Sequence, residues 1–254
     1  MQKLVIVSGA TGTFGRAYLE YFKGQPNTRC VSITRTLFGE HGIQNILTDL
    51  LDAESVADHI SNLSLADISE VVLVHPVGKF KFEKDGLPDG DCDGDGIDDE
   101  VYNSNVLTFQ NIATPLLKRI EAEGRPVPVL FCAFGSISDK YKIKFWNSYT
   151  ESKNILRKWL GELVCNNPGK VRGLFINVST TNTTNENILR PFADKEKWLS
   201  PEEVVERSVP FIESAHEWKE VEVYKPASGF GPEYYLDTKR VLEKWNTEMG
   251  RKLR

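Results

Sequence analysis

The chain has little of what marks several special classes of protein. Its 254 residues include only four cysteines (Cys30, Cys92, Cys132 and Cys165), which are far apart and form no C-x-x-C pair. We therefore expect no disulfide framework and a cytoplasmic location. No apolar run approaches the roughly 18–20 residues of a membrane span, and no signal peptide precedes the apolar run at residues 4–7. These features predict no membrane partner.

An excess of basic residues is also missing. The 31 lysines and arginines are outnumbered by 36 aspartates and glutamates, which gives a net charge of −5. The composition therefore does not indicate the basic surface that binds nucleic acid, and we expect no nucleic-acid partner. The hydrophobic fraction of 40% and the charged fraction of 26% are those of an ordinary globular protein. We predict one domain over residues 1–254, with an acidic loop inserted at about residues 85–100.

Short apolar runs alternate with amphipathic segments along the chain. The runs expected to form strands are residues 4–7, 30–34, 70–75, 127–132, 171–177 and 221–224. The helices are expected near residues 14–22, 52–60, 101–121, 148–164, 201–213 and 235–249. Continuous apolar runs are typical of strands covered on both faces, and strand–helix alternation favours a parallel sheet. We predict an α/β fold, a doubly wound parallel sheet with helices on both faces.

Three glycines lie in the turn between the first predicted strand and the first predicted helix. Gly9 permits a tight turn, Gly12 lets the backbone approach a pyrophosphate, and Gly15 allows the helix to pack closely on the strand. The N-terminus of the helix then presents unpaired N–H groups to the anion. The pattern predicts a dinucleotide site of the Rossmann type, and an ordinary glycine-rich turn is the alternative.

Arg35 follows the second predicted strand. At this position an acidic residue would accept hydrogen bonds from a ribose 2′-hydroxyl, whereas an arginine suits a 2′-phosphate. We therefore predict NADP(H) as the cofactor, with NAD(H) as the alternative. The other interpretation of Arg35 is a solvated surface arginine with no part in binding.

Tyr149 and Lys153 are four residues apart in a predicted helix, so their side chains share one face. The pKa of a free phenol is near 10, and a neighbouring ammonium group would lower it toward the range useful for proton transfer. Ser136 lies 13 residues before Tyr149, just past a predicted strand, where its hydroxyl could bind the same substrate oxygen. The three residues predict proton exchange with a carbonyl or alcohol oxygen. A solvated helix face is the alternative.

Together these features resemble the short-chain dehydrogenase/reductase family over nearly the whole chain. Asn105 resembles the structural and proton-relay asparagine of that family, with Asn103 as the rival assignment. The resemblance implies that the cofactor lies against the glycine turn and the strand ends near it. The implied cofactor-binding residues are Gly9, Thr11, Gly12, Thr13, Phe14, Gly15, Arg35, Asp49, Leu50, His75, Gly78, Tyr149, Lys153, Val178 and Thr183.

The resemblance implies hydride transfer between the nicotinamide and a small-molecule carbonyl or alcohol substrate. Tyr149 would be the general acid–base, Lys153 would lower its pKa and hold the nicotinamide ribose, and Ser136 would orient the substrate oxygen. Asn105 would support a water relay. The family resemblance also implies a homodimer or a homotetramer.

Several positions depart from the pattern of the family. His75 and Gly78 belong to a His-Pro-Val-Gly segment in place of Asn-Asn-Ala-Gly, and Val178 stands at the usual Pro-Gly. The glycine spacing, G-x-x-G-x-x-G, resembles the extended and atypical branches. Two alternatives therefore stay open. One is a non-catalytic, dinucleotide-binding regulatory protein of the same fold, and the other is an epimerase- or isomerase-like enzyme.

The acidic loop resembles a calcium loop. Counted from Asp89, the sequence places acidic residues at the positions that an EF-hand loop requires, which are Asp89, Asp91, Asp93 and Glu100, and Asp95 adds a further carboxylate. Counted from Asp91, the twelfth position is a tyrosine, so the register is open. Hard oxygen ligands on a glycine-rich loop suit Ca²⁺. The alternative is a disordered acidic surface insertion.

Overall fold

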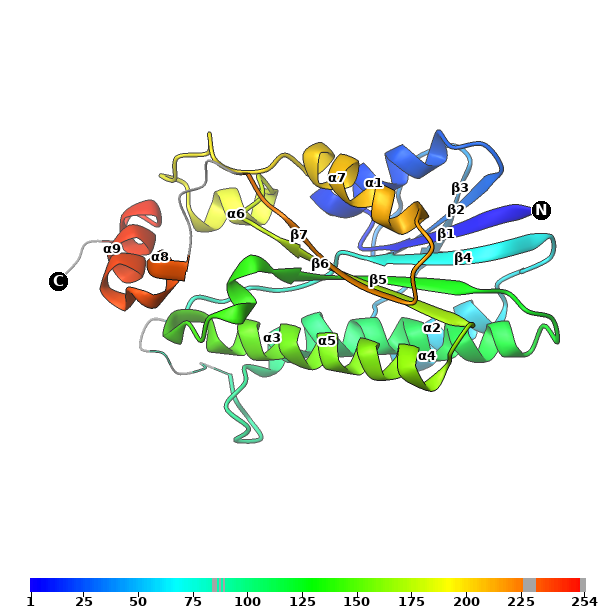
Figure 1. Cartoon of the computed structure of the whole chain (residues 1–254), viewed down its shortest axis with the longest axis horizontal. Helices are drawn as coiled ribbons and strands as arrows, with labels where there is room; N and C mark the ends of the chain where they lie inside the picture. The colour runs from blue at the N-terminus through cyan, green and yellow to red at the C-terminus, as the bar shows by residue number, and fades with distance from the viewer. Residues whose placement is uncertain (84–85, 87, 89, 226–231, 252–254) are drawn as a thin grey trace.

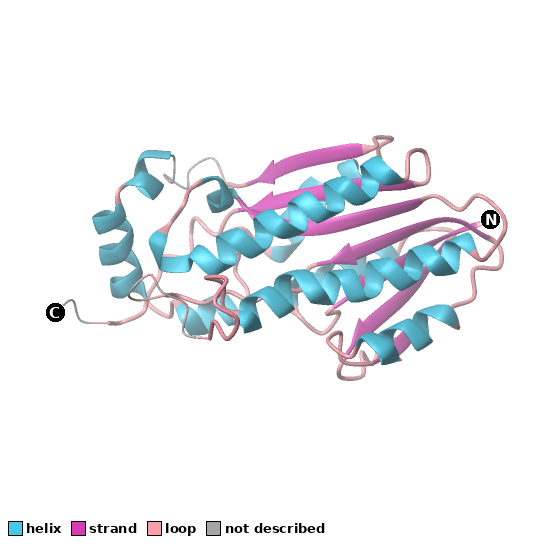
Figure 2. Ribbon diagram, turned by 90° about the horizontal axis from the view of Figure 1, so that it is seen from below, coloured by secondary structure: helices cyan, strands magenta, loops and turns pink. Residues whose placement is uncertain are grey.

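The computed structural model describes residues 1–83, 86, 88, 90–225 and 232–251. Its strands form one parallel sheet in the order β3-β2-β1-β4-β5-β6-β7. The strands are β1 (Gln2–Ser8), β2 (Thr28–Thr34), β3 (Ile43–Leu47), β4 (Ile68–His75), β5 (Val129–Ser136), β6 (Val171–Val178) and β7 (Trp218–Val223). Figure 2 shows the strands pointing the same way, so their carboxyl ends meet at one edge.

Helices cover both faces of the sheet (Figure 1). On one face lie α1 (Thr13–Lys23) and α7 (Pro201–Glu213). On the other lie α2 (Ala53–Ser61), α4 (Thr108–Glu121) and α5 (Asn147–Asn166). The predicted α/β fold with a doubly wound parallel sheet is thus confirmed.

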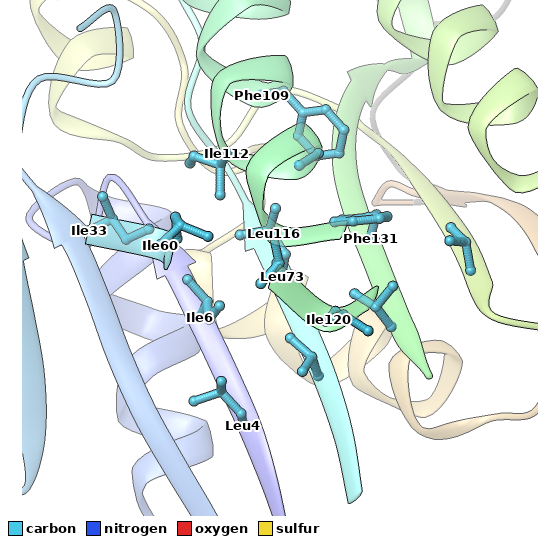
Figure 3. Close-up of a cluster of buried hydrophobic side chains, with 14 of the residues drawn as sticks. Leu4, Ile6, Ile33, Ile60, Leu73, Phe109, Ile112, Leu116, Ile120 and Phe131 are labelled. Carbon is cyan, nitrogen blue, oxygen red and sulfur yellow. The ribbon is translucent and has the colours of Figure 1, made fainter. Parts of the chain in front are cut away.

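The central strands are buried on both sides, which explains their continuous apolar runs. In β1, Leu4 and Ile6 pack against α2, α4 and α5, whereas Val5 and Val7 pack against α1 and α7. Figure 3 shows part of the first of these two clusters. Because successive side chains of a strand point to opposite faces, each central strand contributes to both cores. Each buried side chain of this kind contributes about 1.5–3 kcal/mol relative to exposure.

The sheet and its flanking helices differ from the prediction in two features. The edge strand β3 was not expected, because only Ile43 and Ile46 of its five residues are buried and its apolar run is short. The long helix predicted over residues 101–121 is divided into α3 (Asp99–Tyr102), the π-helical turn η1 (Asn103–Leu107) and α4. Such a turn inserts an extra residue into the helix and often occurs at functional sites.

The carboxyl edge of the sheet carries the remaining short elements. They are the 3₁₀ turns η2 (Ile137–Lys140) and η3 (Lys144–Trp146), and the helices α6 (Thr184–Leu189), α8 (Pro232–Leu236) and α9 (Thr238–Glu248). The single helix predicted at residues 235–249 is wrong, because the side chain of Asp237 accepts a hydrogen bond from the Arg240 amide and begins α9 as a separate helix. Among the described helices, none has both the length and the apolar character needed to cross a bilayer.

Candidate active site

The glycine turn leads into the start of α1, where no side chain caps the helix. Gly9 has a φ of +59°, a conformation that favours glycine, and a Cβ on Gly15 would collide with the backbone of Gly9. The first turn of α1 also contains no acidic residue. The N–H groups of this turn and the positive end of the helix dipole suit an anionic group. The turn therefore fits the pyrophosphate of a dinucleotide.

The other residues predicted around the turn have defined contacts. Thr11 shares a hydrogen bond of 3.2 Å between hydroxyl oxygens with Thr34, at the end of β2. The Thr13 hydroxyl accepts a hydrogen bond from the Thr184 amide, which brings α6 against the glycine turn. The ring of Phe14 stacks on Phe134, with centroids 5.9 Å apart.

Farther along the sheet edge, three of the predicted cofactor-binding residues separate into exposed and buried ones. Arg35 and Asp49 are exposed just beyond β2 and β3. Leu50 is buried in the core between the sheet and α2, and its carbonyl accepts a hydrogen bond from Asn111. Only Arg35 and Asp49 of these three therefore offer side chains to a ligand.

Asn105 holds the segment that follows β4. Its amide group donates to the Lys79 carbonyl at 3.0 Å, and its Oδ1 accepts from the Lys79 amide at 2.8 Å. The second N–H donates to the Ser152 hydroxyl at 2.8 Å. Since both amide hydrogens are used within the protein, Asn105 can serve a water relay only through its oxygen. The rival Asn103 is only half-buried.

Gly78 lies between Asn105 and Lys153. A Cβ at Gly78 would stand 2.6 Å from Asn105 Oδ1 and 3.0 Å from Lys153 Nζ. The segment after β4 therefore reaches the buried ammonium group only because this position has no side chain.

His75 is fully buried, and its protonation state follows from its hydrogen bonds. The Thr108 hydroxyl donates to the Ser104 carbonyl, so it must accept from His75 Nε2, 3.1 Å away. The other ring nitrogen, Nδ1, accordingly accepts from the Ser8 hydroxyl at 2.7 Å. Burial, with Lys153 as a smaller contribution, lowers the pKa of His75 to about 3. We interpret His75 as a neutral structural residue that joins β1, β4 and α4.

Tyr149 and Lys153 lie one helical turn apart on α5, with Lys153 Nζ 5.6 Å from the centre of the Tyr149 ring. From the sequence, a lowered pKa is expected for the Tyr149 phenol, and this direction is wrong. Burial, together with the carboxylates of Asp139 and Glu186, raises the pKa of Tyr149 well above its ordinary value. Burial lowers the pKa of Lys153, because desolvation disfavours its charged form.

Ser136 ends β5 and begins the turn η2. Its hydroxyl accepts from the Ser138 amide at 3.1 Å and lies 2.8 Å from the Ser138 hydroxyl. Its own amide donates to Asp139 Oδ2 at 2.8 Å. This reciprocal capping arrangement fixes the Ser136 side chain at the edge of the sheet.

A cavity of about 180 Å³ lies at this edge, next to Ser136 and Tyr149. On the side of the glycine turn it is lined by Phe14, Val178 and Thr183. Thr183 also caps α6, since its hydroxyl accepts from the Glu186 amide. One cavity thus brings together predicted catalytic residues and part of the predicted cofactor set.

Sequence reasoning missed several residues of this site. Asp139 is buried with one carboxylate oxygen unpaired, and burial raises its pKa. The side chains of Arg190, Phe80 and Trp245 line the cavity from three separate segments. The only signal for Asp139 was its position three residues after Ser136. The other three have no spacing that links them in the sequence.

Glu83, another residue missed, caps the helix that carries Tyr149. Its two carboxylate oxygens accept from the amides of Asn147 (2.8 Å) and Ser148 (3.1 Å) at the start of α5. No side chain from the helix itself caps this end. A buried carboxylate at a helix N-terminus interacts favourably with the helix dipole.

The acidic loop gathers three of the carboxylates predicted to bind calcium. One oxygen from each of Asp91, Asp93 and Asp95 lies within 4.8 Å of the others. Both carboxylate oxygens of Asp91 also accept backbone N–H groups of the loop. Asp89 lies outside the described residues. This grouping agrees with the register counted from Asp91.

Glu100 does not belong to that group. Its carboxylate pairs with Lys79 and, at 2.9 Å, with Lys81. Hydrogen bonds from these lysines lower the pKa of Glu100. The two lysines of the preceding loop therefore hold Glu100 in this structure, and it is not grouped with the three aspartates as the predicted ligand set requires.

No protein-family model matches the chain, and no curated protein matches it. Solved structures do resemble it. A short-chain dehydrogenase from Burkholderia cenocepacia in complex with NADP has a TM-score of 0.69 and 16% identity, and the match covers 96% of this chain and 99% of that one. An alcohol dehydrogenase from the archaeon Thermococcus sibiricus, complexed with 5-hydroxy-NADP, has a TM-score of 0.69, 18% identity and coverages of 91% and 99%.

A third similar structure contains the other nicotinamide cofactor. It is 4-hydroxyisoleucine dehydrogenase complexed with NADH, with a TM-score of 0.69, 15% identity and coverages of 87% of this chain and 96% of that one. At such identities the likeness concerns the fold. The resemblance predicted from the sequence is confirmed at that level: this chain has the fold of the short-chain dehydrogenases.

Proposed function

We propose that the protein is an NADP(H)-dependent oxidoreductase of the short-chain dehydrogenase/reductase family, and that it interconverts a carbonyl and an alcohol on a small molecule. The observation that carries the proposal is that Ser136 and Tyr149 line the same cavity as Phe14 of the glycine turn. A bound nicotinamide dinucleotide would supply or accept the hydride. The protein would bind it, orient the substrate and move the proton.

The residues of the chain suit carbonyl reduction in particular. Burial keeps the Tyr149 phenol protonated, so it begins as an acid that can donate its proton to a carbonyl oxygen. Ser136 would hydrogen-bond the same oxygen. Lys153, buried beside the phenol, would stabilise the phenolate left after donation. Asn105 would fix the segment that carries Gly78 and, through Ser152, the turn of α5 that bears Tyr149.

The proposed cofactor site extends along the carboxyl edge of the sheet. Gly9, Gly12, Gly15 and the first turn of α1 would hold the pyrophosphate. Asp49 would lie at the adenine. The exposed guanidinium of Arg35 would pair with a 2′-phosphate, which favours NADP(H) over NAD(H).

Binding and turnover of both cofactors would test this function. We expect calorimetry to show tighter binding of NADPH than of NADH, and the preference to be lost in Arg35→Glu. Tyr149→Phe should reduce carbonyl turnover by about 10²–10⁴-fold, the range of general acid catalysis, while NADPH still binds. Tyr21→Phe, on the partly exposed side of α1, is the matched control and should keep full activity.

Two other outcomes would favour the alternatives. Binding of NADPH without oxidation of any of a broad panel of carbonyls would indicate a non-catalytic regulatory protein. Purified protein that retains nicotinamide and shows no net redox would indicate an epimerase- or isomerase-like enzyme, the reading suggested by the G-x-x-G-x-x-G spacing.

We also propose a homodimer or homotetramer that associates through α4 and α5. Leu117, Ile155, Trp159 and Leu163 on these helices are apolar and only partly buried. Light scattering after size exclusion should give a multiple of the chain mass of 28.7 kDa, and a monomer would contradict the assignment. One domain over residues 1–254 and a cytoplasmic location also stay predictions.

Calcium binding stays a prediction, now confined to Asp91, Asp93 and Asp95. We expect calcium titration to release heat and calcium to raise the melting temperature, with EDTA reversing the effect. Asp93→Asn should weaken both. No heat and an unchanged melting temperature would eliminate the site.

A further inference from the structure

The cavity beyond Ser136 and Tyr149 has an aromatic wall. Phe80, Trp146 and Trp245 line it together with Tyr234 and Tyr235 of α8. Phe80 stacks on Trp245 with ring centres 5.2 Å apart and meets the Tyr149 ring edge-on at 5.2 Å. Trp146 and Trp245 lie 4.8 Å apart. The rings hold one another in place, so the wall offers a rigid apolar surface next to the phenol.

The charged groups of the cavity lining cancel one another. Arg190 pairs with Glu186 and, at 3.0 Å, with Glu248. Lys244 also pairs with Glu248. Two cations thus meet two carboxylates. Within the described lining, no cation is left uncompensated to attract a carboxylate or phosphate on the substrate.

Protein cations already lie over several of the ring faces. The guanidinium of Arg190 is 4.2 Å from the centre of the Trp245 ring, and that of Arg240 is 5.7 Å from the centre of the Tyr234 ring. Lys153 occupies the corresponding position over Tyr149. An aromatic cage for an ammonium ligand needs free ring faces, and protein cations already occupy these three. The wall therefore disfavours a cationic substrate as well.

We propose that the substrate is a small, uncharged ketone whose carbonyl is attached to an aromatic ring, or the alcohol derived from it. The proposal rests on the proposed function. The ketone accepts a hydride at its carbonyl carbon from NADPH and a proton at its oxygen from Tyr149, which gives the secondary alcohol and NADP⁺ and leaves the ring unchanged. The cavity of about 180 Å³ would also have to admit part of the cofactor beside Phe14, Val178 and Thr183. The space left suits a small substrate with one ring rather than a drug-sized ligand, for which roughly 300–1,000 Å³ is usual.

Four ketones of similar size separate the effects of flatness, negative charge and positive charge of the substrate. Acetophenone is flat and neutral, cyclohexyl methyl ketone is neutral and not flat, para-acetylbenzoate is anionic, and para-trimethylammonio acetophenone is cationic. With NADPH, we expect kcat/KM for acetophenone to exceed that of the other three by about tenfold or more, which corresponds to about 1.4 kcal/mol. A higher value for the cyclohexyl, anionic or cationic ketone would overturn the assignment.

A pair of phenylalanines on one loop provides matched variants. Phe80 lines the cavity, whereas Phe82 packs on Trp146 and Trp245 and does not line the cavity. Both are half-buried. Phe80→Leu should lower kcat/KM for acetophenone about tenfold and change that for cyclohexyl methyl ketone less than about twofold. Phe82→Leu should leave both unchanged. Equal losses for both ketones in Phe80→Leu would mean that the ring acts only in packing, which would sink the proposal.

Failure of the substrate class can be distinguished from failure of the function. Acetophenone cannot react when NADP⁺ is the bound cofactor, so calorimetry can measure its binding alone. Binding of acetophenone without turnover with NADPH keeps the ligand class and refutes the oxidoreductase. Turnover of aliphatic or charged carbonyls without binding of acetophenone keeps the oxidoreductase and refutes the ligand class.

Discussion

At the scale of single residues, Asp139 is the carboxylate with the larger effect on the proposed proton donor, ahead of Glu186, because its charge raises the pKa of Tyr149 more. Tyr149, Lys153 and Arg157 follow one another at intervals of four residues, so they form a column on one face of α5. Asp139 faces this column, with Arg157 3.5 Å away. Its charge raises the pKa of both Tyr149 and Lys153. Glu220 and Tyr235 face the same carboxylate from β7 and α8.

Asp139→Asn should shift proton transfer to lower pH. The amide oxygen can still accept the Ser136 amide, but the negative charge that disfavours the phenolate is gone. In the direction of alcohol oxidation, which needs the phenolate, the rising limb of the pH–rate profile should move to lower pH. At a fixed pH on that limb, the rate should rise roughly three- to tenfold. The exposed Asp58→Asn is the control. An unmoved limb would show that Asp139 acts only in packing.

His75 predicts a pH dependence of stability. Its pKa is about 3 in the folded protein and near 6.5 when the chain is unfolded, so below 6.5 only the unfolded state binds the proton. The contribution of neutral His75 to the free energy of unfolding is therefore complete above pH 6.5 and is lost as the pH falls toward 3. Between pH 7 and pH 5 the free energy of unfolding should fall by about 1–2 kcal/mol more in wild type than in His75→Asn. Urea unfolding measures this, with exposed His59→Asn as the control. Equal slopes in wild type and His75→Asn would contradict it.

The sequence could reveal residues whose chemistry depends on spacing along the chain. The three glycines of the first turn and the Tyr149–Lys153 pair are of this kind, because a turn or one helix face places them. It could not reveal the sign of the effect on Tyr149. That sign is set by burial and by Asp139 and Glu186, which fold onto the phenol from other segments. Desolvation is a property of the packed structure and not of residue spacing.

At the scale of elements, the orientation of α5 depends on a carboxylate from another segment. Glu83→Ala would remove the acceptor of the Asn147 and Ser148 amides at the N-terminus of α5. We expect the free energy of unfolding to fall by about 1–3 kcal/mol, the cost of a lost cap and of buried unpaired amides. Turnover should fall as well, since Tyr149 lies in the first turn of this helix. Glu83→Gln should lose less, because its amide oxygen still accepts one N–H.

Glu54→Gln provides the control for this cap, since Glu54 lies in the first turn of α2 but is exposed. Denaturant unfolding and steady-state kinetics on the three variants measure both effects. If Glu83→Ala were as stable and as active as Glu54→Gln, the cap would be irrelevant to the site.

Most helices and strands could be predicted from long periodic segments of the sequence. The points at which helices are interrupted could not. The apolar spacing over residues 101–121 continues through η1, so the pattern indicates one helix. The interruption depends on tertiary contacts: the bonds of Asn105 to Lys79 and Ser152, and the acceptance of the His75 proton by Thr108. These contacts join residues far apart in the sequence, and the spacing of apolar residues does not reveal such contacts.

At the scale of the molecule, the parallel sheet explains how a site can be predicted in part. All its strands end at one edge, so the glycine turn, Ser136 and the segment after β6 must meet there once the fold is known. The far wall of the cavity is different. It comes from α6, α8 and α9, which belong to no strand end, and their placement depends on packing of Arg190 and the aromatic rings.

Arg190 should therefore matter for the stability of the whole cavity wall. It connects α6 through Glu186, α9 through Glu248, and the segment after β6 through Thr180. Because Glu186 and Glu248 are largely buried, Arg190→Met would leave their charges without the guanidinium. We expect the free energy of unfolding to fall by about 3–5 kcal/mol, the cost of breaking a buried ion pair from one side.

The double variant Arg190→Met with Glu186→Gln separates charge from packing. If unpaired charge is the cause, the amide should restore part of the lost stability, since a neutral group is cheaper to bury than a carboxylate. The exposed Arg207→Met on α7 is the control and should change stability by less than about 0.5 kcal/mol. Urea unfolding at neutral pH measures all three. Because Arg190 joins three segments of the wall, we expect Arg190→Met to weaken acetophenone binding as well as to lower the free energy of unfolding. A destabilised variant that binds acetophenone as tightly as wild type would show that Arg190 does not support the cavity wall.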